Sequence, residues 1–428
     1  MKEYRPPRGF RDFPPEVMLL RREVIGKVVK VFERYGYEPL DTPVVENWET
    51  LAGKYGEEAE SKLMWRFTDP WSGKEYALRY DLTVPLARFI SNNMDLPLPF
   101  KRYHIAPVWR HEEPQRGRYR EFYQCDVDIV GSPYPEADAE IVEVVGESLR
   151  ELGFSGFRIR LNDRRLLSAI FEEELGLSDP LPVYRAIDKL DKVGQEGVRR
   201  ELSRAVGESI AERVMGLISL GGGAEAMRAL CSKYSHNPRA REACEHLEQL
   251  TSLAGEVSFD LSLVRGLDYY TGPILEVVLD RPKIGSVAGG GRYDRLIGAF
   301  TGKDVPATGA SLGIERLIDA GAELGILKAP RSTVTDVYMV VVDWSFVGYA
   351  WKVAKELRRG GFNVRIDPSR ASEEAQRKRA RRLGAPVIAF VGRTETEGGT
   401  ITLYSPSRGE RVVAKLEEAS LALRRLLP

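Results

Sequence analysis

The sequence predicts an α+β body on a mostly antiparallel sheet flanked by helices, with a helical insertion and a separate C-terminal α/β domain. Three observations support this fold class. Short extended segments follow one another between residues 40 and 130 without a helix between each pair, which is typical of antiparallel pairing. Long charged helical segments interrupt this pattern near residue 165, and it returns near residue 261. From residue 331, strands and helices alternate as in an α/β domain.

These changes of pattern set the domain limits. We expect the body at residues 1–164 and 256–328, the helical insertion at residues 165–255, and the α/β domain at residues 331–428. A chain of 428 residues has room for roughly three domains of about 150 residues each.

The elements of the body follow in order. Two prolines open a helix at residue 14, and apolar residues then recur at three- and four-residue spacing to about residue 34. Beyond Gly36 we expect strands, at residues 40–45, 65–68, 76–79, 101–110 and 119–130. Two charged helices are expected in the insertion, at residues 184–206 and 208–220, with three glycines at 221–223 as a joint.

The C-terminal domain is expected to be compact, with a largely parallel sheet. Its strands are predicted at residues 337–342, 363–367, 387–391 and 400–404. Its helices are predicted at residues 346–359, 372–383 and about 416–426. Alternation at this spacing is typical of βαβ units.

Charge is divided unevenly along the chain. Lys plus Arg and Asp plus Glu both number 63, so the formal net charge is zero. Residues 331–428 nevertheless hold 18 basic and 11 acidic residues, a net +7, and the remainder carries −7. Arg377 and Arg381 lie in one predicted helix of the basic domain. Solvated helix faces would give this pattern, and so would a surface that contacts a phosphate backbone.

Composition excludes several classes of protein. No apolar run approaches the roughly 18 residues of a membrane span. The first residues are charged and proline-rich, unlike a signal peptide. The three cysteines, Cys125, Cys231 and Cys244, are too few and too uneven for an expected disulfide framework, so we expect a reducing, cytoplasmic location.

Three familiar motifs fail on inspection. The chain has no P-loop. Residues 309–313 fit the G-x-S-x-G nucleophile pattern, but all four histidines precede them, and that chemistry needs a later one. Cysteines and histidines between residues 231 and 246 match none of the usual zinc spacings, so no metal site is expected.

The hairpin expected at residues 100–131 carries the most informative polar side chains. On its second strand a period of two puts four side chains on one face: Phe122, Gln124, Asp126 and Asp128. Arg110 ends the first strand. Arginines would lie at the open end of the hairpin, and carboxylates would lie deeper. This arrangement suits a ligand that is anionic at one end and cationic at the other. A solvated strand face is the alternative.

Four other segments add to this set. An acid and a hydroxyl, Asp81 and Thr83, lie two residues apart, on one face if their strand continues. Further segments hold Arg265 beside two tyrosines, the glycines at 289–291, and Arg316. Counting Arg110 and Arg118, four arginines are available, and fixed arginines stabilise charge developing on phosphate oxygens. Phosphoryl or nucleotidyl transfer is therefore the predicted chemistry.

Six segments together resemble the histidyl-tRNA synthetase family, within the class II aminoacyl-tRNA synthetases. They are RGFRDFPPE, LRYDLTVPLAR, VWRHEEPQRGRYREFYQCDVDIVG, RGLDYYTG, VAGGGRYDRLI and ATGASLGIERL. The unit after residue 330 resembles the family's anticodon-binding domain, so the resemblance covers nearly the whole chain. It implies that histidine and ATP form histidyl-adenylate and that the histidyl group then moves to the terminal ribose of tRNA(His).

The resemblance also implies site residues and partners. Arg265 and Arg110 would be catalytic. Histidine would be bound by Asp81, Thr83, Arg110, Gln124, Asp128, Arg265, Tyr269 and Tyr270. ATP, with accompanying Mg²⁺, would be bound by Arg110, Glu112, Arg118, Phe122 and Arg316. tRNA would contact Gln115, Arg116, Arg377 and Arg381, and the protein would be a homodimer.

Two rival functions share this fold. One is the non-catalytic regulatory subunit of ATP phosphoribosyltransferase, and the other is a module that senses uncharged tRNA. The regulatory class tends to lose the catalytic arginines and the terminal domain, whereas Arg110, Arg265, Arg316 and the basic α/β unit are present here. One departure from the family is Asp128, the shorter of the two acids acceptable at its position.

Overall fold

The computed structural model describes residues 3–56, 59–220, 222–255, 257–264, 269–329 and 331–427. The chain forms two compact units. One contains Val24–Lys328 with the segment Met1–Asp12, and the other contains Ala329–Pro428 with Phe13–Glu23. None of the helices in the described part of the chain combines the length and apolarity that crossing a bilayer would require.

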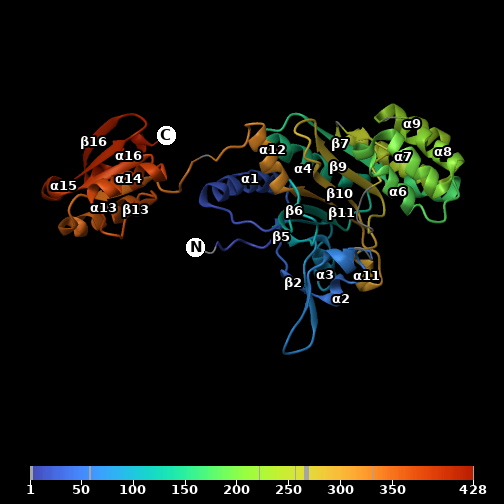
Figure 1. Cartoon of the computed structure of the whole chain (residues 1–428), viewed down its shortest axis with the longest axis horizontal. Coiled ribbons are helices and arrows are strands. Elements are labelled where there is room, and N and C mark those ends of the chain that lie inside the picture. Colours follow the sequence, from blue (N-terminus) through green and yellow to red (C-terminus); the bar gives the residue numbers. More distant parts are fainter. Residues whose placement is uncertain are drawn as a thin grey trace. The chain divides into compact units, whose positions relative to one another are not determined.

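The first unit is built on a large sheet, eight-stranded over the described residues, with the order β1-β5-β6-β11-β10-β9-β7-β8. The strands are β1 (Glu38–Pro39), β5 (Phe100–Trp109), β6 (Glu121–Val130), β7 (Phe157–Asp163), β8 (Ser258–Phe259), β9 (Pro273–Leu279), β10 (Ser286–Arg292) and β11 (Ala307–Gly313). The inner pairs are antiparallel, and only the short edge strands β1 and β8 pair in parallel. Helices α4 (Pro135–Glu151) and α12 (Ile314–Glu323) pack on its central strands (Figure 1). The predicted α+β class is confirmed.

A small sheet in the order β2-β4-β3 lies beside the large one. Its strands are β2 (Val45–Asn47), β3 (Arg66–Thr68) and β4 (Glu75–Leu78), and the neighbouring helical segments are α2 (Trp48–Leu51), α3 (Thr83–Ser91) and the π-helical turn Ala59–Leu63. Helix α1 (Pro15–Arg34) instead contacts β5, through Phe32 and Tyr103. The strand predicted at residues 40–45 is wrong. Pro43 has no N–H to donate to a ladder, and the N–H of Thr42 bonds to the Asp41 carboxylate instead.

Helices dominate residues 164–254. They are α5 (Arg164–Ser168), a π-helical segment (Ala169–Glu174), α6 (Leu181–Ile187), α7 (Leu190–Val206), α8 (Glu208–Ile218), α9 (Ala224–Lys233) and α10 (Pro238–Ala254). The single helix predicted at residues 184–206 is wrong, because the chain breaks between α6 and α7 and Gly194 has a φ of 69°. Helix α10 packs along α4, which joins these helices to the sheet.

One disulfide departs from the sequence expectation. Cys231 on α9 is bonded to Cys244 on α10, with their Cα atoms 5.7 Å apart, while Cys125 on β6 is a buried free thiol. The two helices follow one another closely in the chain, and this brings cysteines 13 residues apart into reach. A count of cysteines does not reveal such a helix pair.

The C-terminal unit holds a sheet, five-stranded within the described residues, in the order β13-β12-β14-β15-β16. Its elements are β12 (Val337–Val341), the 3₁₀ turn Trp344–Phe346, α13 (Val347–Arg359), β13 (Val364–Ile366), α14 (Glu373–Leu383), β14 (Val387–Val391), α15 (Arg393–Gly398), β15 (Thr400–Ser405), β16 (Glu410–Lys415), the 3₁₀ turn Leu416–Glu418 and α16 (Ala419–Leu426). The sheet is mixed rather than largely parallel, since β15 pairs antiparallel with β14 and β16. Helix α15 is too short for a parallel crossover.

Candidate active site

A cavity of about 240 Å³ opens on the face of the large sheet formed by β6, β10 and β11. Most residues predicted as ligand contacts line it: Thr83, Arg110, Glu112, Arg118, Phe122, Gln124, Asp128, Tyr269, Tyr270 and Arg316. Asp126, Tyr293, Ser311 and Glu315 line it as well. Segments distant in the sequence therefore converge on one pocket.

Strand β6 supplies the floor of the cavity. Its alternate residues project into the cavity, as a period of two requires, and Cys125 and Val127 are buried on the opposite side. Strand β11 lies next to it, with Gly309 paired to Asp128 and Ser311 paired to Asp126. A Cβ on Gly309 would lie 2.0 Å from Asp128 Oδ1, so glycine at this position leaves room for the carboxylate.

Arg110 is fixed at one end of the cavity. Its guanidinium lies 4.4 Å from the ring centre of Tyr80 and 5.2 Å from that of Phe122, and its Nε donates to the Tyr80 carbonyl at 3.1 Å. Stacking between aromatic rings suits a planar guanidinium better than an ammonium group. The remaining donors of Arg110 are thereby held in one orientation.

Two more arginines lie at this end. Arg316 lies in the first turn of α12, and it donates to the carbonyls of Gly117 at 2.8 Å and Ser286 at 2.5 Å. Burial and the nearby charge of Arg118 lower the pKa of Arg316. Arg118 itself is only loosely paired, 3.8 Å from Glu112. Guanidiniums that oppose one another in this way form a site for a polyanion.

The opposite end of the cavity is acidic and deeply buried. Asp128 Oδ2 lies 2.8 Å from Nη2 of Arg102, an ion pair whose angle is not that of a hydrogen bond, and Oδ1 accepts from the Tyr293 hydroxyl. Asp126 accepts from Gln124 Nε2 at 3.2 Å and from Ser311. Burial raises the pKa of both carboxyl groups, that of Asp126 to about 7.

Asp81 and Thr83 lie in a different backbone setting from the one expected. Strand β4 ends at Leu78 and Thr83 begins α3, so the two residues do not share a strand face. Thr83 lines the cavity, whereas Asp81 lies behind the lining. Asp81 accepts from the hydroxyls of Tyr55 and Tyr269 at 2.8 and 3.0 Å and from the N–H of Val84 at 3.1 Å.

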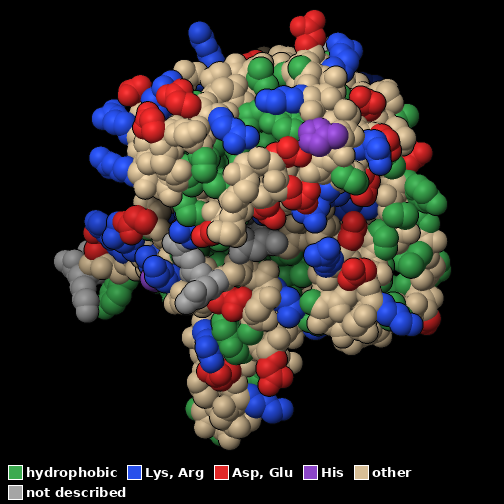
Figure 2. Space-filling model, turned by 90° about the vertical axis from the view of Figure 1, so that its right-hand side faces the viewer, with side chains coloured by type: hydrophobic (Ala, Val, Ile, Leu, Met, Phe, Trp, Pro, Cys, Tyr) green, Lys and Arg blue, Asp and Glu red, His purple; other side chains and the backbone are tan. Residues whose placement is uncertain are grey.

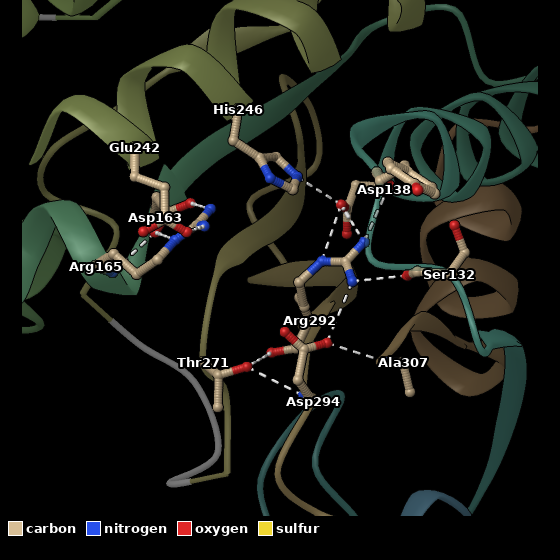
Figure 3. Close-up of polar contacts among 11 residues, drawn as sticks. Ser132, Asp138, Asp163, Arg165, Glu242, His246, Thr271, Arg292, Asp294 and Ala307 are labelled. Carbon is tan, nitrogen blue, oxygen red and sulfur yellow. Dashed lines mark hydrogen bonds and ion pairs between the residues drawn. The ribbon is translucent and has the colours of Figure 1, made fainter. Parts of the chain in front are cut away.

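A buried charge network lies at the end of β10, next to Tyr293. Its neighbour Arg292 donates to Asp138 of α4 through Nε at 3.1 Å and Nη2 at 2.6 Å (Figure 3). His246 of α10 contacts the same Asp138 oxygen at 2.7 Å. Nearby, Arg165 bridges Asp163 and Glu242 in the same view. Ion pairs thus link the helical segment to β10, which ends directly before Tyr293.

The other predicted site residues lie elsewhere. Arg265 falls outside the described residues. Gln115 and Arg116 are exposed in the β5–β6 loop, where Arg116 pairs with Glu323. In the C-terminal unit, Arg377 and Arg381 are exposed one turn apart on α14, and Arg377 pairs with Glu373 and lies over the Phe390 ring.

The surface around the helical segment is not uniformly basic. Residues 165–255 contain 12 Lys or Arg and 14 Asp or Glu. On the side of the molecule shown in Figure 2, basic and acidic side chains are interspersed. The basic excess of the chain lies in the C-terminal domain.

Sequence reasoning gave no role to Asp126, Tyr293 or Arg102. The period of two placed Asp126 on the cavity face, and the glycine-rich segment contained Tyr293, so both signals were present. Arg102 lies on the other strand of the hairpin, and its ion pair with Asp128 depends on the register of β5 with β6.

An antiparallel sheet that carries this arginine cluster on one hairpin and one helix defines a class II aminoacyl-tRNA synthetase. The sequence profile of the family described as histidyl-tRNA synthetase matches residues 9–317, and that of the anticodon binding domain matches residues 336–426. The chain belongs to the histidyl-tRNA synthetase family.

Individual relatives agree. The chain is 64% identical to the histidine–tRNA ligase of Aeropyrum pernix, over 99% of this chain and 98% of the relative, and 54% identical to that of Korarchaeum cryptofilum, over 98% of each. The crystal structure of histidyl-tRNA synthetase from Nostoc superposes with a TM-score of 0.83 over all of both chains, at 27% identity. A structure titled ATP phosphoribosyltransferase regulatory subunit/histidyl-tRNA synthetase, from Bacillus halodurans, has a TM-score of 0.73 at 22% identity, covering 88% of this chain and 97% of that one, and shows the shared fold alone.

Proposed function

We propose that this protein is a histidine–tRNA ligase, which joins L-histidine to tRNA(His) at the expense of ATP. The observation that carries the proposal is one cavity, in a member of this family, with arginines at one end and buried hydrogen-bond acceptors at the other. Such a cavity fits an amino acid joined to a nucleotide. In the first step the histidine carboxylate attacks the α-phosphorus of ATP, and the bond to pyrophosphate breaks.

The arginine end supplies charge stabilisation for this step. Arg110 contacts the α-phosphate, and Arg118 and Arg316 bind the outer phosphates. Phe122 stacks on the adenine and Glu112 accepts from it. Because the nucleophile is already a carboxylate, no general base is needed, and positioning with fixed cations lowers the barrier. Arg265 is assigned to the α-phosphate and the substrate carboxylate on the family motif alone.

The acidic end holds the amino acid. Thr83 and Gln124 receive the substrate ammonium group, with the charge of Asp81 behind them. Asp128, Tyr269 and Tyr270 surround the imidazole. The two tyrosine rings meet edge to face at 5.2 Å between centres, which gives the pocket rigid walls. A site that hydrogen-bonds a ring nitrogen rejects apolar side chains strongly.

Mg²⁺ enters with ATP as part of the substrate. Phosphate oxygens and water are its preferred ligands, and the ion would neutralise charge on the departing pyrophosphate. In the second step a hydroxyl of the terminal ribose of tRNA attacks the histidyl carbonyl and AMP leaves. The exposed Gln115 and Arg116 lie on the loop beside the cavity, where an acceptor end would approach.

The basic C-terminal domain binds the anticodon stem, and Arg377 and Arg381 contact its backbone. The double variant Arg377→Gln/Arg381→Gln should bind tRNA more weakly and with a salt slope lower by about two. Arg393→Gln, an exposed arginine on α15, is the control. Filter binding across a salt series measures the affinity and the salt slope of each variant. An unchanged slope in the double variant would argue against this surface.

We also assign the protein to the cytoplasm as a homodimer. Six large apolar side chains that stay exposed fall within residues 44–98: Val44, Val45, Phe67, Trp71, Met94 and Leu98. Part of this region is the β3–β4 hairpin, which extends from its unit (light blue in Figure 1). Exposed apolar side chains of this size are typical of subunit interfaces. Sedimentation equilibrium distinguishes a dimer of about twice 48.1 kDa from a monomer.

The decisive experiment is histidine-dependent exchange of labelled pyrophosphate into ATP. Exchange with histidine, and none with other amino acids, supports the enzyme. No exchange would favour one of the two non-catalytic alternatives, the regulatory subunit or the tRNA sensor. Transfer of labelled histidine to tRNA then tests the second step.

A further inference from the structure

The loop that connects β5 to β6, residues 110–120, carries two of the residues assigned to ATP. Glu112 lies on its outgoing arm, residues 111–113, and Arg118 lies on its returning arm, residues 118–120. Both side chains line the cavity. Within the described residues, the loop makes one backbone hydrogen bond to itself at its base and a pair near its tip. A loop with so few internal bonds needs contacts from elsewhere to keep its side chains in place.

A short stretch near the N-terminus, residues 8–11, lies against this loop, and we call it the strap. Two prolines, Pro6 and Pro7, restrict the backbone directly before it. A turn follows, in which the N–H of Phe10 bonds to the carbonyl of Pro7 at 3.0 Å and Gly9 has a φ of 89°. A turn that needs a positive φ at its third residue favours glycine there. The sequence PRGF thus fixes the path of the strap.

The strap holds the returning arm through a backbone bond and a guanidinium. The N–H of Arg120 donates to the carbonyl of Gly9 at 3.0 Å. A Cβ on Gly9 would lie 2.7 Å from Cγ of Arg120, so a side chain at this position would displace that residue. The guanidinium of Arg11 lies 3.3 Å from the ring centre of Tyr119, which lines the cavity next to Arg118. The strap therefore contacts the residue beside a proposed phosphate ligand.

The strap reaches the outgoing arm through a row of aromatic rings. The ring of Phe10 meets that of Trp65 edge to face at 5.8 Å between centres, and Trp65 meets the ring of His111 in the same way at 5.0 Å. Arg8 also pairs with Glu113, but both side chains are exposed, so the rings contribute more than this ion pair. The residue assigned to the adenine lies between His111 and Glu113 in the chain.

Helix α12 supports the same loop. The hydroxyl of Tyr119 donates to Asp319 at 3.2 Å, and Arg316 donates to the carbonyl of Gly117 at 2.8 Å. The strap adds contacts to both arms, and it can therefore fix the separation between them. Phe10 and Arg11 lie outside the cavity lining, so they act on the site only through the loop.

We propose that the strap is a positioning element for ATP, which holds the two arms of the β5–β6 loop so that Glu112 and Arg118 face the nucleotide. The inference rests on the proposed function. Three residues assigned to histidine lie outside this loop: Thr83, Gln124 and Asp128. Loss of the strap should therefore weaken the binding of ATP and leave that of histidine unchanged.

Pyrophosphate exchange by Phe10→Ala is the first test. Because this variant loses the contact with Trp65, its KM for ATP should rise about tenfold while its KM for histidine stays within about twofold of the wild type. Phe10→Tyr keeps the ring and should restore the KM for ATP to within about twofold. Tyr4→Ala is the control, since Tyr4 precedes the strap and is 86% exposed, and it should behave like the wild type. An unchanged KM for ATP in Phe10→Ala, or equal rises in both KM values, would overturn the proposal.

Limited digestion with trypsin follows the loop without any substrate. Mass spectrometry identifies the fragments cut after Arg116 and Arg118, and thermal melting confirms that each variant is folded. Phe10→Ala and Gly9→Ala should be cut at these sites about fivefold faster than the wild type, because cleavage follows the population of the opened loop. Equal rates would show that the loop does not depend on the strap and would overturn the proposal. Absence of histidine-dependent exchange in the wild type is a separate result, which would count against the proposed function, and the digestion rates would still decide whether the strap holds the loop.

Discussion

The two ends of the cavity differ in burial and in charge. At the arginine end the side chains are half-buried, Arg118 is 41% exposed, and charges of one sign are gathered without a full set of partners. At the acidic end Asp126, Asp128 and Tyr293 are almost wholly buried and tied to specific neighbours. Under the proposed function, the first end binds the strongly charged ATP, and the second binds the histidine side chain.

The difference has an energetic consequence. A triphosphate brings its own large charge, so the arginines need only to be held in orientation, as the Tyr80 and Phe122 rings hold Arg110. Recognition of an uncharged ring gains little from the overall charge of the site. It depends on hydrogen bonds between the ring and the buried polar groups. Substitutions at the arginine end should therefore change rates, and those at the acidic end should also change folding stability.

The largest expected effect is on catalysis by Arg110. Arg110→Lys keeps the charge and loses the planar fork and the stacking, so exchange kcat/KM should fall about 1000-fold, or about 4 kcal/mol. Arg120→Lys is the control, because Arg120 lies on the same hairpin and does not line the cavity; its Nε bonds only to the backbone carbonyl of Glu112, a residue that does line it. A loss of less than about fivefold in Arg110→Lys would show that charge alone suffices at this end.

A smaller change, in stability, is expected at Asp128. Asp128→Asn leaves the fully buried Arg102 without its anion, and unpairing a buried charge typically costs several kcal/mol. We expect the free energy of unfolding at pH 7 to fall by about 3 kcal/mol, measured by urea denaturation. Asp343→Asn, at an exposed 3₁₀ cap of the C-terminal unit, provides a comparison that changes one carboxylate without a buried partner.

At Asp126 we expect the opposite effect: replacing this carboxylate should stabilise the fold at neutral pH. Its pKa is about 7 in the folded protein and about 4 when unfolded, so between these values the folded state holds more protons and loses stability as pH rises. Asp126→Asn removes this penalty. The free energy of unfolding of this variant, relative to that of the wild type, should rise by about 2 kcal/mol from pH 5 to pH 7. Urea denaturation at each pH measures this difference. A constant difference would mean that the carboxyl titrates normally.

Features with local sequence signals could be predicted, whereas features that depend on packing between distant segments could not. Regular patterns gave the antiparallel body, the hairpin and its cavity face, because a period of two and the arginine motifs are local signals. The limits of α6 and α7, the mixed C-terminal sheet and the Cys231–Cys244 bond depend on how elements pack, which local patterns do not contain. The different surroundings of Asp126 and Asp128 depend on the position of Arg102 across the strand pair, which the sequence alone does not give.

The smallest expected effect lies at the open rim, on Arg118. Its ion pair with Glu112 spans 3.8 Å and is half in solvent, so its contribution to stability should be within about 0.5 kcal/mol. Arg118→Gln should raise the KM for ATP about three- to fivefold and leave kcat and the KM for histidine almost unchanged, because outer-phosphate binding here is screened by water. Arg116→Gln, two residues away and outside the cavity lining, should leave exchange unaltered. A tenfold loss of kcat in Arg118→Gln would mean that this arginine stabilises the transition state. Arg118 would then share the role that we expect for Arg110, in spite of its exposure to solvent.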